Sequence, residues 1–198
     1  MNRFNSKFLG GVMALSHAIL ASLIHCPASG YELAKKFDNS VGFFWHATHQ
    51  QIYRELTRME ERGWLSTETI HQDGRPDKKI YSVTTSGETE MRQWIAKPSE
   101  LNPTKEDILV KLYAGQIVET AVLLAEVRRY QQEHTQQLSV YRHIEASYFA
   151  KPAELDRHDQ LVYLTLRCGI RQEESWIAWC EEAIAYLEHQ PRLDSPTS

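Results

Sequence analysis

The chain has 198 residues, of which 42% are hydrophobic, and a formal net charge of −4. This size suits one or two globular domains, and the negative net charge argues against a protein that coats nucleic acid. No apolar run approaches the roughly 20 residues that a membrane span needs, and the start lacks a secretory cleavage pattern, so a cytoplasmic protein is expected.

The charge is divided unevenly between the two halves. Residues 1–97 carry 12 Lys and Arg against 10 Asp and Glu, whereas residues 98–198 carry 10 against 16. A mildly basic half can contact DNA, and an acidic half is better suited to assembly. The three cysteines fit no metal or redox spacing and are expected to be small buried side chains in a reducing compartment. They are Cys26, Cys168 and Cys180.

Three helices are predicted in the first 62 residues. After an arm at residues 1–11, a first helix is predicted at residues 12–25, and Pro27 prevents it from continuing. Ser29 is the predicted N-cap of a second helix, which continues to about residue 37. The third helix starts near Thr48 and stops at Gly63. Its apolar stripe, at helical spacing, is Ile52, Leu56 and Met59.

A β-hairpin is predicted next. Two β-rich runs, residues 64–70 and 79–84, flank a polar tip at residues 72–78. Residues 85–87 are expected to form a turn and cap, and residues 88–96 a fourth helix. Three helices, two strands and a helix in this order are the arrangement of a winged helix-turn-helix domain.

Beyond a predicted linker at residues 97–104, which contains two prolines, the chain is expected to be helical at residues 105–114, 118–150 and 158–189. Each long helix would reach about 45 Å and carries a heptad-like seam. The first seam is Leu123, Val127, Tyr130, His134, Gln137, Tyr141, Ile144 and Tyr148, and the second is Leu166, Ile170, Glu173, Ile177, Cys180, Ile184 and Leu187.

The predicted fold class is therefore mainly α, of the α+β type. A winged helix-turn-helix DNA-binding domain is expected at residues 1–97, and a long-helix dimerisation domain at residues 105–190. Long helices of this kind need another helix pair to cover their seams, most simply from a second copy of the chain.

The polar face of the third helix carries candidate DNA contacts. Gln50 and Arg54 lie one turn apart, and their side chains suit adenine and guanine in the major groove, although a solvated face is the alternative. Tyr53 either contacts DNA through its hydroxyl or is a half-buried aromatic. Arg58 either reaches a phosphate or pairs with an acidic neighbour.

Further DNA contacts are expected at the start of the third helix and on the hairpin. Thr48 and His49 precede Gln50 and are candidate contacts. Arg75, Lys78 and Lys79 surround the hairpin tip and suit phosphates or the minor groove, although Asp residues in the tip partly cancel their charge.

No catalytic constellation, P-loop or dinucleotide fingerprint is present, so neither an enzyme nor a cofactor is expected. His46 and His49 have helical spacing but no third ligand nearby, so no metal site is expected either. Aromatic residues raise the question of a cavity for a small aromatic ligand between the two domains; the alternative is that they fill the core. These residues are Trp94, Tyr130, Trp176 and Trp179.

Five segments in the first half resemble the PadR family of transcriptional regulators. They are residues 13–20 (MALSHAIL), 29–33 (SGYEL), 51–56 (QIYREL), 56–65 (LTRMEERGWL) and 79–87 (KIYSVTTSG). The resemblance covers about residues 10–97. The second half resembles, through length and helical pattern, the virulence-activator type of C-terminal domain. Two departures from the family pattern are the bulky start of the third helix at residues 48–50, which bears on base preference, and Trp64 in place of an aliphatic residue.

This resemblance implies a cytoplasmic homodimer that binds palindromic operator DNA, usually as a repressor, and that is released by a small aromatic or phenolic effector. The alternative interpretation is a winged-helix protein-interaction module without DNA binding, which would fit the small positive charge of the first half.

Overall fold

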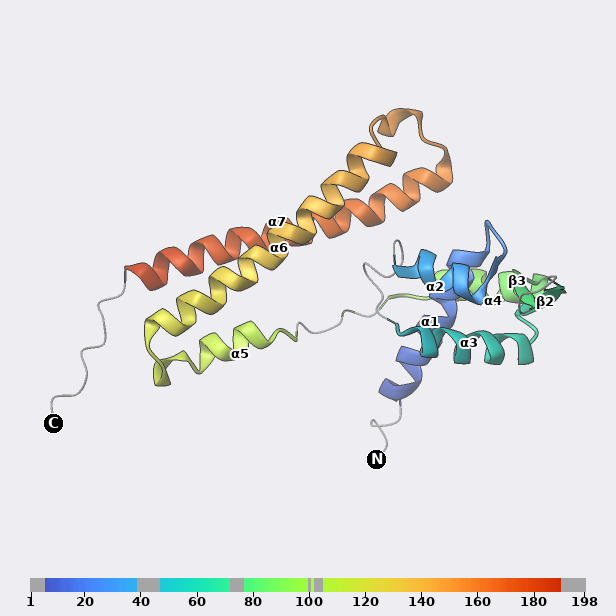
Figure 1. The fold of residues 1–198 in the computed structure, drawn as a ribbon, viewed down its shortest axis with the longest axis horizontal. Coiled ribbons are helices and arrows are strands. Elements are labelled where there is room, and N and C mark those ends of the chain that lie inside the picture. Colours follow the sequence, from blue (N-terminus) through green and yellow to red (C-terminus); the bar gives the residue numbers. More distant parts are fainter. Residues whose placement is uncertain (1–5, 39–46, 72–76, 100, 102–104, 190–198) are drawn as a thin grey trace. The chain divides into compact units, whose positions relative to one another are not determined.

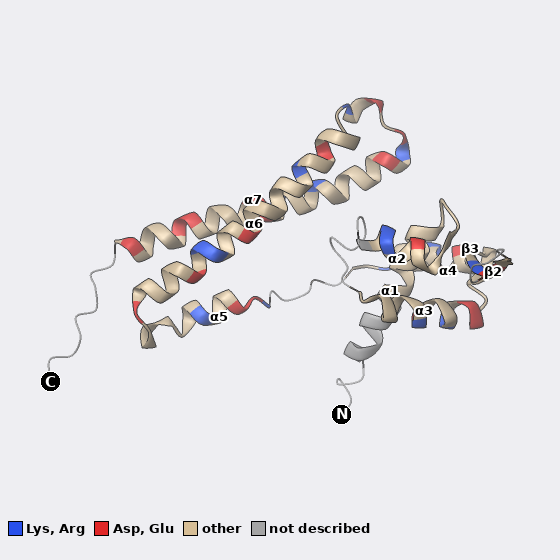
Figure 2. Cartoon of the chain, viewed as in Figure 1, with Lys and Arg blue, Asp and Glu red and all other residues tan. Residues whose placement is uncertain are grey.

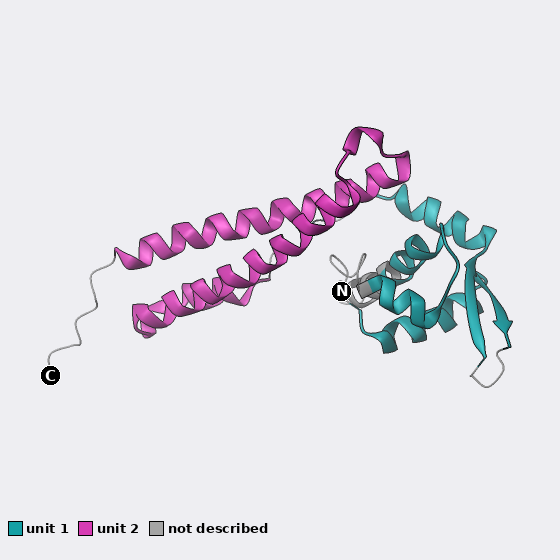
Figure 3. Ribbon diagram, turned by 45° about the horizontal axis from the view of Figure 1, so that its top comes forward, with its two compact units in different colours: residues 1–101 teal, residues 102–198 magenta. Residues whose placement is uncertain are grey.

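The computed structural model of the chain describes residues 6–38, 47–71, 77–99, 101 and 105–189. The chain divides into two compact units, Met1–Leu101 (unit 1) and Asn102–Ser198 (unit 2), which Figure 3 distinguishes by colour. Across the described residues, no helix is long and apolar enough to cross a membrane.

Unit 1 combines helices with a small antiparallel sheet (Figure 1). Its elements are α1 (Ser6–Leu23), β1 (Ala28–Ser29), α2 (Gly30–Asp38), α3 (His49–Glu61), β2 (Leu65–Ile70), β3 (Lys78–Val83) and α4 (Thr85–Ile95). This order confirms the predicted winged helix-turn-helix arrangement, in which β2 and β3 form the wing.

Two helices of unit 1 begin several residues earlier than predicted. Helix α1 begins at Ser6, six residues earlier than expected, because the paired glycines at its start lower helix propensity without preventing a helix. Helix α4 begins at Thr85, so that residues 85–87 form its first turn and are not a separate turn. The cap is Thr84, whose Oγ1 accepts a hydrogen bond from the Gly87 amide at 3.1 Å.

The sheet contains a strand that the sequence pattern did not predict. Strand β1 is only two residues long, too short to show an alternating pattern, and it pairs with β3 in the register Ala28↔Tyr81. The strand order is β1-β3-β2, and β2 pairs with β3 from Leu65↔Val83 to Ile70↔Lys78. The wing is therefore joined through β3 to the segment that enters α2.

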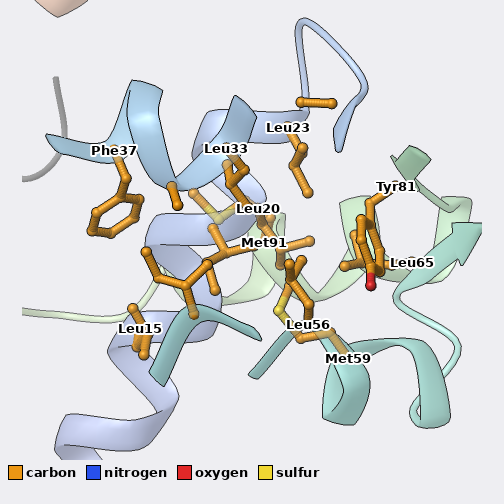
Figure 4. Packing of buried hydrophobic residues seen from close by; sticks show 14 residues of the cluster. Leu15, Leu20, Leu23, Leu33, Phe37, Leu56, Met59, Leu65, Tyr81 and Met91 are labelled. Carbon is orange, nitrogen blue, oxygen red and sulfur yellow. The ribbon is translucent and has the colours of Figure 1, made fainter. Parts of the chain in front are cut away.

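The hydrophobic core of unit 1 receives side chains from all four helices and the sheet (Figure 4). Ile52, Leu56 and Met59 of α3 are completely buried, as the apolar stripe predicted. Complete burial of each such side chain contributes about 1.5–3 kcal/mol. The same core thus fixes which face of α3 points inward and which remains open.

Unit 2 is built from helices. They are α5 (Asp107–Tyr113), η2 (Gly115–Ile117), α6 (Thr120–Tyr148), η3 (Pro152–Glu154) and α7 (Arg157–Glu188). Helices α6 and α7 have 29 and 32 residues and pack along one another.

The two predicted seams meet between α6 and α7, where Val127, Tyr141, Ile170 and Cys180 are buried. The prediction that Tyr148 belongs to the first seam is wrong. Its side chain is 74% exposed, at the residue where α6 ends. Cys26 and Cys168 are exposed, so only Cys180 is buried as expected.

A carboxylate at the α6–α7 contact is expected to make unit 2 sensitive to acid. Glu145 accepts hydrogen bonds from Arg142 at 2.7 Å and from Arg167 and Tyr163 at 2.9 Å. The two guanidinium groups, Arg142 foremost, lower the pKa of Glu145 from 4.5 to about 2. Because the folded pKa lies below the unfolded one, the stabilisation is complete above pH 4.5 and is lost as the pH falls toward 2.

Replacing Glu145 by Gln should therefore remove on the order of 2 kcal/mol of stability at pH 7 and flatten the acid loss. Urea midpoints followed by circular dichroism between pH 7 and 3 would measure both effects. Glu182→Gln, at an exposed position of α7, is the charge-matched control. An acid dependence as steep in Glu145→Gln as in the unchanged protein would contradict the prediction.

Candidate nucleic-acid interface

The start of α3 is held by a capping box. The Thr48 amide donates to Gln51 Oε1 at 2.8 Å, and the Gln51 amide donates to Thr48 Oγ1 at 3.2 Å. Thr48 is therefore the N-cap of α3, at the predicted start of this helix, and it is exposed together with His49 and Gln50. The capping box fixes where α3 begins and so which side chains its first turn presents.

The face of α3 opposite the core is polar and open to solvent. Gln50 and Arg54 are exposed, one turn apart, while Ile52 and Leu56 are buried beneath them. Within the described part of the chain, no carboxylate is bonded to Arg54. Figure 2 shows the basic positions along α3 and the acidic residues at its C-terminal end. The exposed glutamine and arginine side chains of this face can therefore form hydrogen bonds with base edges in a major groove.

A buried glutamate on α3 was not predicted. Glu55 is only 2% exposed, and its Oε1 accepts a hydrogen bond from Ser16 Oγ of α1 at 2.7 Å. Its Oε2 lies 3.3 Å from the guanidinium of Arg58, so Arg58 pairs with an acidic neighbour as one of its two interpretations anticipated. The signal was available, because position 55 follows Ile52 by three residues and therefore lies beside the core stripe.

The two described wing lysines are also paired with carboxylates. Lys78 Nζ lies 2.8 Å from Glu32 Oε1 of α2, and Lys79 Nζ lies 2.7 Å from Glu60 Oε2 of α3. These pairs connect the end of the wing next to its tip with the start of α2 and the end of α3. Arg75, the third predicted wing cation, lies outside the described residues.

Tyr53 packs against the start of α2. A β-carbon added to Gly30 would come within 2.4 Å of Tyr53 Cε1, so the ring lies directly on the glycine. The side chain is nevertheless 44% exposed. Tyr53 is therefore a half-buried aromatic at the junction of α2 and α3, and part of it remains accessible to a ligand on the open face.

Comparison with known proteins assigns both units. Residues 19–93 match the transcriptional regulator PadR-like family, and residues 104–188 match the virulence activator alpha C-terminal domain. The probable transcriptional regulator Rv1176c of Mycobacterium tuberculosis is 45% identical over 190 residues, which cover 90% of this chain and all of that protein. The chain belongs to the PadR-like family of transcriptional regulators.

Two further proteins are similar to this PadR-like regulator over most of its length. The structure of the Vibrio cholerae virulence activator AphA has 32% identity and a TM-score of 0.73, covering 88% of this chain and 98% of AphA. The negative transcriptional regulator PadR of Bacillus subtilis is 28% identical over 88% of this chain and 97% of its own. A structure of that PadR with operator DNA has the same fold, with a TM-score of 0.79, 24% identity and coverage of 88% and 99%.

The family assignment confirms a transcriptional regulator rather than an enzyme, and it favours DNA binding over the alternative of a winged-helix protein-interaction module. Which side chains of the regulator contact DNA stays a prediction for all nine residues named above.

The two interpretations of Tyr53 in the regulator can be separated by substitution. Tyr53→Phe keeps the ring on Gly30 and removes only the hydroxyl, whereas Tyr53→Ala removes both. We expect Tyr53→Phe to weaken binding to DNA by about tenfold with unchanged thermal stability, because a single hydrogen bond to a charged group is lost. Fluorescence anisotropy together with thermal melting would measure this; equal affinity for Tyr53→Phe and the unchanged protein would assign the ring to packing alone.

The predicted ligand-binding aromatics of the regulator fall in both units. In unit 1, Trp94 stacks on the completely buried His17 with ring centroids 4.5 Å apart, and Glu90 Oε1 lies 3.2 Å from His17 Nε2. Because His17 is completely buried and lies against Trp94 and Glu90, it has a structural role in unit 1. Glu90 also lines an open hollow of about 360 Å³, together with Trp64, Thr85, Ser86, Thr89 and Gln93.

In unit 2 the other three aromatics form a cluster between α6 and α7. Trp176 lies edge-on to Tyr130 and Trp179, with centroids 5.6 and 5.4 Å apart, and stacks on His134. The Tyr130 hydroxyl donates to Glu106 at 3.1 Å, and His134 bonds Glu173. Burial, followed by the hydrogen bond to Glu106, raises the pKa of Tyr130. The rings contact one another, which is the arrangement expected of a core.

Proposed function

We propose that this PadR-like regulator is a cytoplasmic homodimeric repressor that binds a palindromic operator. Residues 1–97 would bind DNA, and residues 105–190 would form the dimer. In a two-fold dimer, the two copies of α3 would enter major grooves about 34 Å apart, and the wings would contact flanking phosphates. The expected DNA contacts are Thr48, His49, Gln50, Tyr53, Arg54, Arg58, Arg75, Lys78 and Lys79.

The observation that carries this proposal is the open face of α3. Gln50 and Arg54 are exposed on a helix whose opposite side is completely buried, so the helix can enter a groove without disturbing the core. Arg suits guanine and Gln suits adenine, and each good pair discriminates between bases by about 1–3 kcal/mol.

Exposed apolar residues of unit 2 support a dimer. Val110, Tyr113 and Ile117, on α5 and η2, are 68%, 94% and 82% exposed, and Val122 at the start of α6 is 56% exposed. Apolar side chains gathered on neighbouring elements favour burial against another protein surface. A second copy of the same chain supplies a matching surface through two-fold symmetry.

Repression is supported by the relative named as a negative transcriptional regulator. It is also the simpler action physically, because a dimer that occupies a promoter excludes polymerase without needing a surface that recruits it. The alternative is activation of transcription, which is supported by the similarity to AphA, a protein named as a virulence activator. A promoter fusion in cells that lack the regulator would increase in expression under repression and decrease under activation.

The DNA-binding part of the proposal is tested by fluorescence anisotropy across a salt series. The purified protein would be titrated with a duplex from its own upstream region, a duplex selected from random sequence, and a scrambled duplex. Tight, salt-dependent binding to a palindromic duplex supports the proposal, since each phosphate contact contributes a slope of about −0.9. Equal, weak binding to every duplex, including those from the selection, would refute it.

We also propose that a small aromatic effector releases the regulator from DNA, with the rings of Trp94, Tyr130, Trp176 and Trp179 as candidate contacts. The B. subtilis PadR, whose fold this chain shares, has a structure in complex with p-coumaric acid. Adding p-coumaric acid to the preformed DNA complex should lower its anisotropy and quench tryptophan emission. If millimolar p-coumaric acid changed neither the anisotropy nor the tryptophan emission, this compound would be excluded as the effector.

A further inference from the structure

Most of the cations in the proposed DNA-binding set are already paired within the protein. Of the four that the structure describes, Arg58, Lys78 and Lys79 each contact a glutamate, and only Arg54 does not. A Lys–Glu pair has no net charge, so it attracts a distant phosphate only weakly. The paired wing lysines therefore differ in electrostatic effect from unpaired lysines at the same positions.

Glu32 is a fixed partner for Lys78. It lies in the first turn of α2, where its Oε2 accepts hydrogen bonds from the Ser29 amide at 3.0 Å and the Ser29 hydroxyl at 2.9 Å. Its other oxygen receives Lys78 Nζ at 2.8 Å. The bond to Lys78, followed by those to Ser29, lowers the pKa of Glu32 to about 2, so the carboxylate remains charged at every physiological pH.

Glu60 has the corresponding position at the end of α3. Its Oε1 accepts a hydrogen bond from Thr67 Oγ1 of β2, and its Oε2 accepts one from Lys79 Nζ of β3, both at 2.7 Å. These bonds, that to Lys79 foremost, lower the pKa of Glu60. One carboxylate thus connects α3 to both strands of the wing and holds Lys79 beside the helix that would enter the groove.

Both pairs are accessible enough to exchange partners. Lys78 and Lys79 are 34% and 44% exposed, and their glutamates 45% and 31%. Ion pairs at such positions are weak, so a phosphate brought close to the lysine can replace the carboxylate. A replacement of this kind needs the phosphate to be held in place, which base contacts by α3 would do on an operator and not on other sequences.

We propose that Glu32 and Glu60 hold Lys78 and Lys79 away from DNA phosphates unless α3 is seated on its operator. This inference rests on the proposed DNA-binding function and extends it. On non-operator DNA the two glutamates hold the lysines, and the wing contributes little affinity. On the operator the lysines pass to the phosphates, and counterions are released from the DNA.

The test uses Glu32→Gln and Glu60→Gln in the full chain. Glutamine keeps an oxygen for Ser29 or Thr67 and can serve in the capping box of α2, so both variants retain the local hydrogen bonds. Glu68→Gln is the matched control: it changes the net charge equally and lies on β2, but Glu68 is exposed and bonds neither lysine. Circular dichroism and melting temperature would check that all three variants fold.

The selected operator duplex and a scrambled duplex would be titrated by anisotropy over a salt series. We expect Glu32→Gln and Glu60→Gln each to bind the scrambled duplex about fivefold more tightly, with a salt slope steeper by about 0.9. Operator affinity should rise by at least the same factor, because the Lys–Glu pair no longer has to be broken when the operator binds. The salt slope on the operator should stay unchanged, because the lysine contacts a phosphate there in both proteins. Glu68→Gln should leave the affinities for both duplexes and both salt slopes unchanged.

A double-mutant cycle assigns the effect to the lysine. Combined with Lys78→Gln, Glu32→Gln should no longer strengthen binding to scrambled DNA. Persistence of the gain in that background, or an equal gain in Glu68→Gln, would overturn the inference in favour of a general charge effect. The unchanged protein is measured first: failure to bind any duplex would refute the proposed function itself, which is a different outcome from a normal operator complex with unresponsive variants.

Discussion

Replacing Gly87 by alanine is expected to destabilise unit 1 by about 3 kcal/mol, although it adds a single methyl group. The new β-carbon would lie 2.3 Å from the carbonyl oxygen of Trp64 and 3.0 Å from Val83 Cγ1. That oxygen already accepts a hydrogen bond from the Thr84 amide at 3.0 Å. Because the obstacle is main chain, the start of the wing or the first turn of α4 must move.

Gly63 provides the comparison for this prediction. It has a φ of 71°, and a β-carbon there would meet nothing within 4 Å, so Gly63→Ala should cost only the left-handed strain of about 1–2 kcal/mol. Hydrogen exchange of peptides from unit 1, measured on the full chain, would report the stability of this unit apart from unit 2. Equal destabilisation by the two substitutions would show that the main chain at Trp64 moves away from the added β-carbon at little cost.

Replacing Arg54 by alanine is expected to weaken operator binding by about 1–3 kcal/mol, which is roughly 10- to 100-fold, while binding to scrambled DNA changes little. Arg54 is exposed on α3 and has no bonded carboxylate among the described residues, so its guanidinium is available to a guanine edge. Because its contact would be with a base, the loss should depend on the sequence of the duplex.

Arg92→Ala is the control for Arg54→Ala. Arg92 lies on α4, is exposed and pairs with Glu88, so its removal changes the net charge of unit 1 equally without altering α3. Anisotropy titrations with single-base variants of the operator would show which position loses discrimination in Arg54→Ala. Equal losses on operator and scrambled DNA would assign Arg54 to phosphate binding.

Local patterns in the sequence predicted the elements that carry the proposed site. Thr48 marks the start of α3 because a side-chain oxygen there satisfies a free amide, and Gly63 follows its end because glycine tolerates a positive φ. The buried stripe of α3 followed from helical spacing. From these features the exposed face with Gln50 and Arg54 could be identified before the structure was known.

Contacts between distant parts of the chain could not be predicted in this way. Lys78 and Glu32 are 46 residues apart, and their ion pair exists only because β3 pairs with β1 directly before α2. The register of β1 depends on two residues, too few for an alternating pattern. Packing of the whole domain, rather than any local preference, therefore decides which of the predicted DNA-binding cations are already neutralised.

Adjacent residues of α1 contact α3 and α4. Ser16 bonds Glu55 of α3, and the next residue, His17, stacks on Trp94 of α4, the last helix before unit 2 begins. Both α1 residues are buried, so neither contact can be relieved by solvent. A tilt imposed on α4 can consequently reach α3 through α1, by these contacts and by the hydrophobic core that the three helices share. A rotation of a few degrees at the chain segment that leads to unit 2 would change the angle at which α3 meets DNA, without any unfolding.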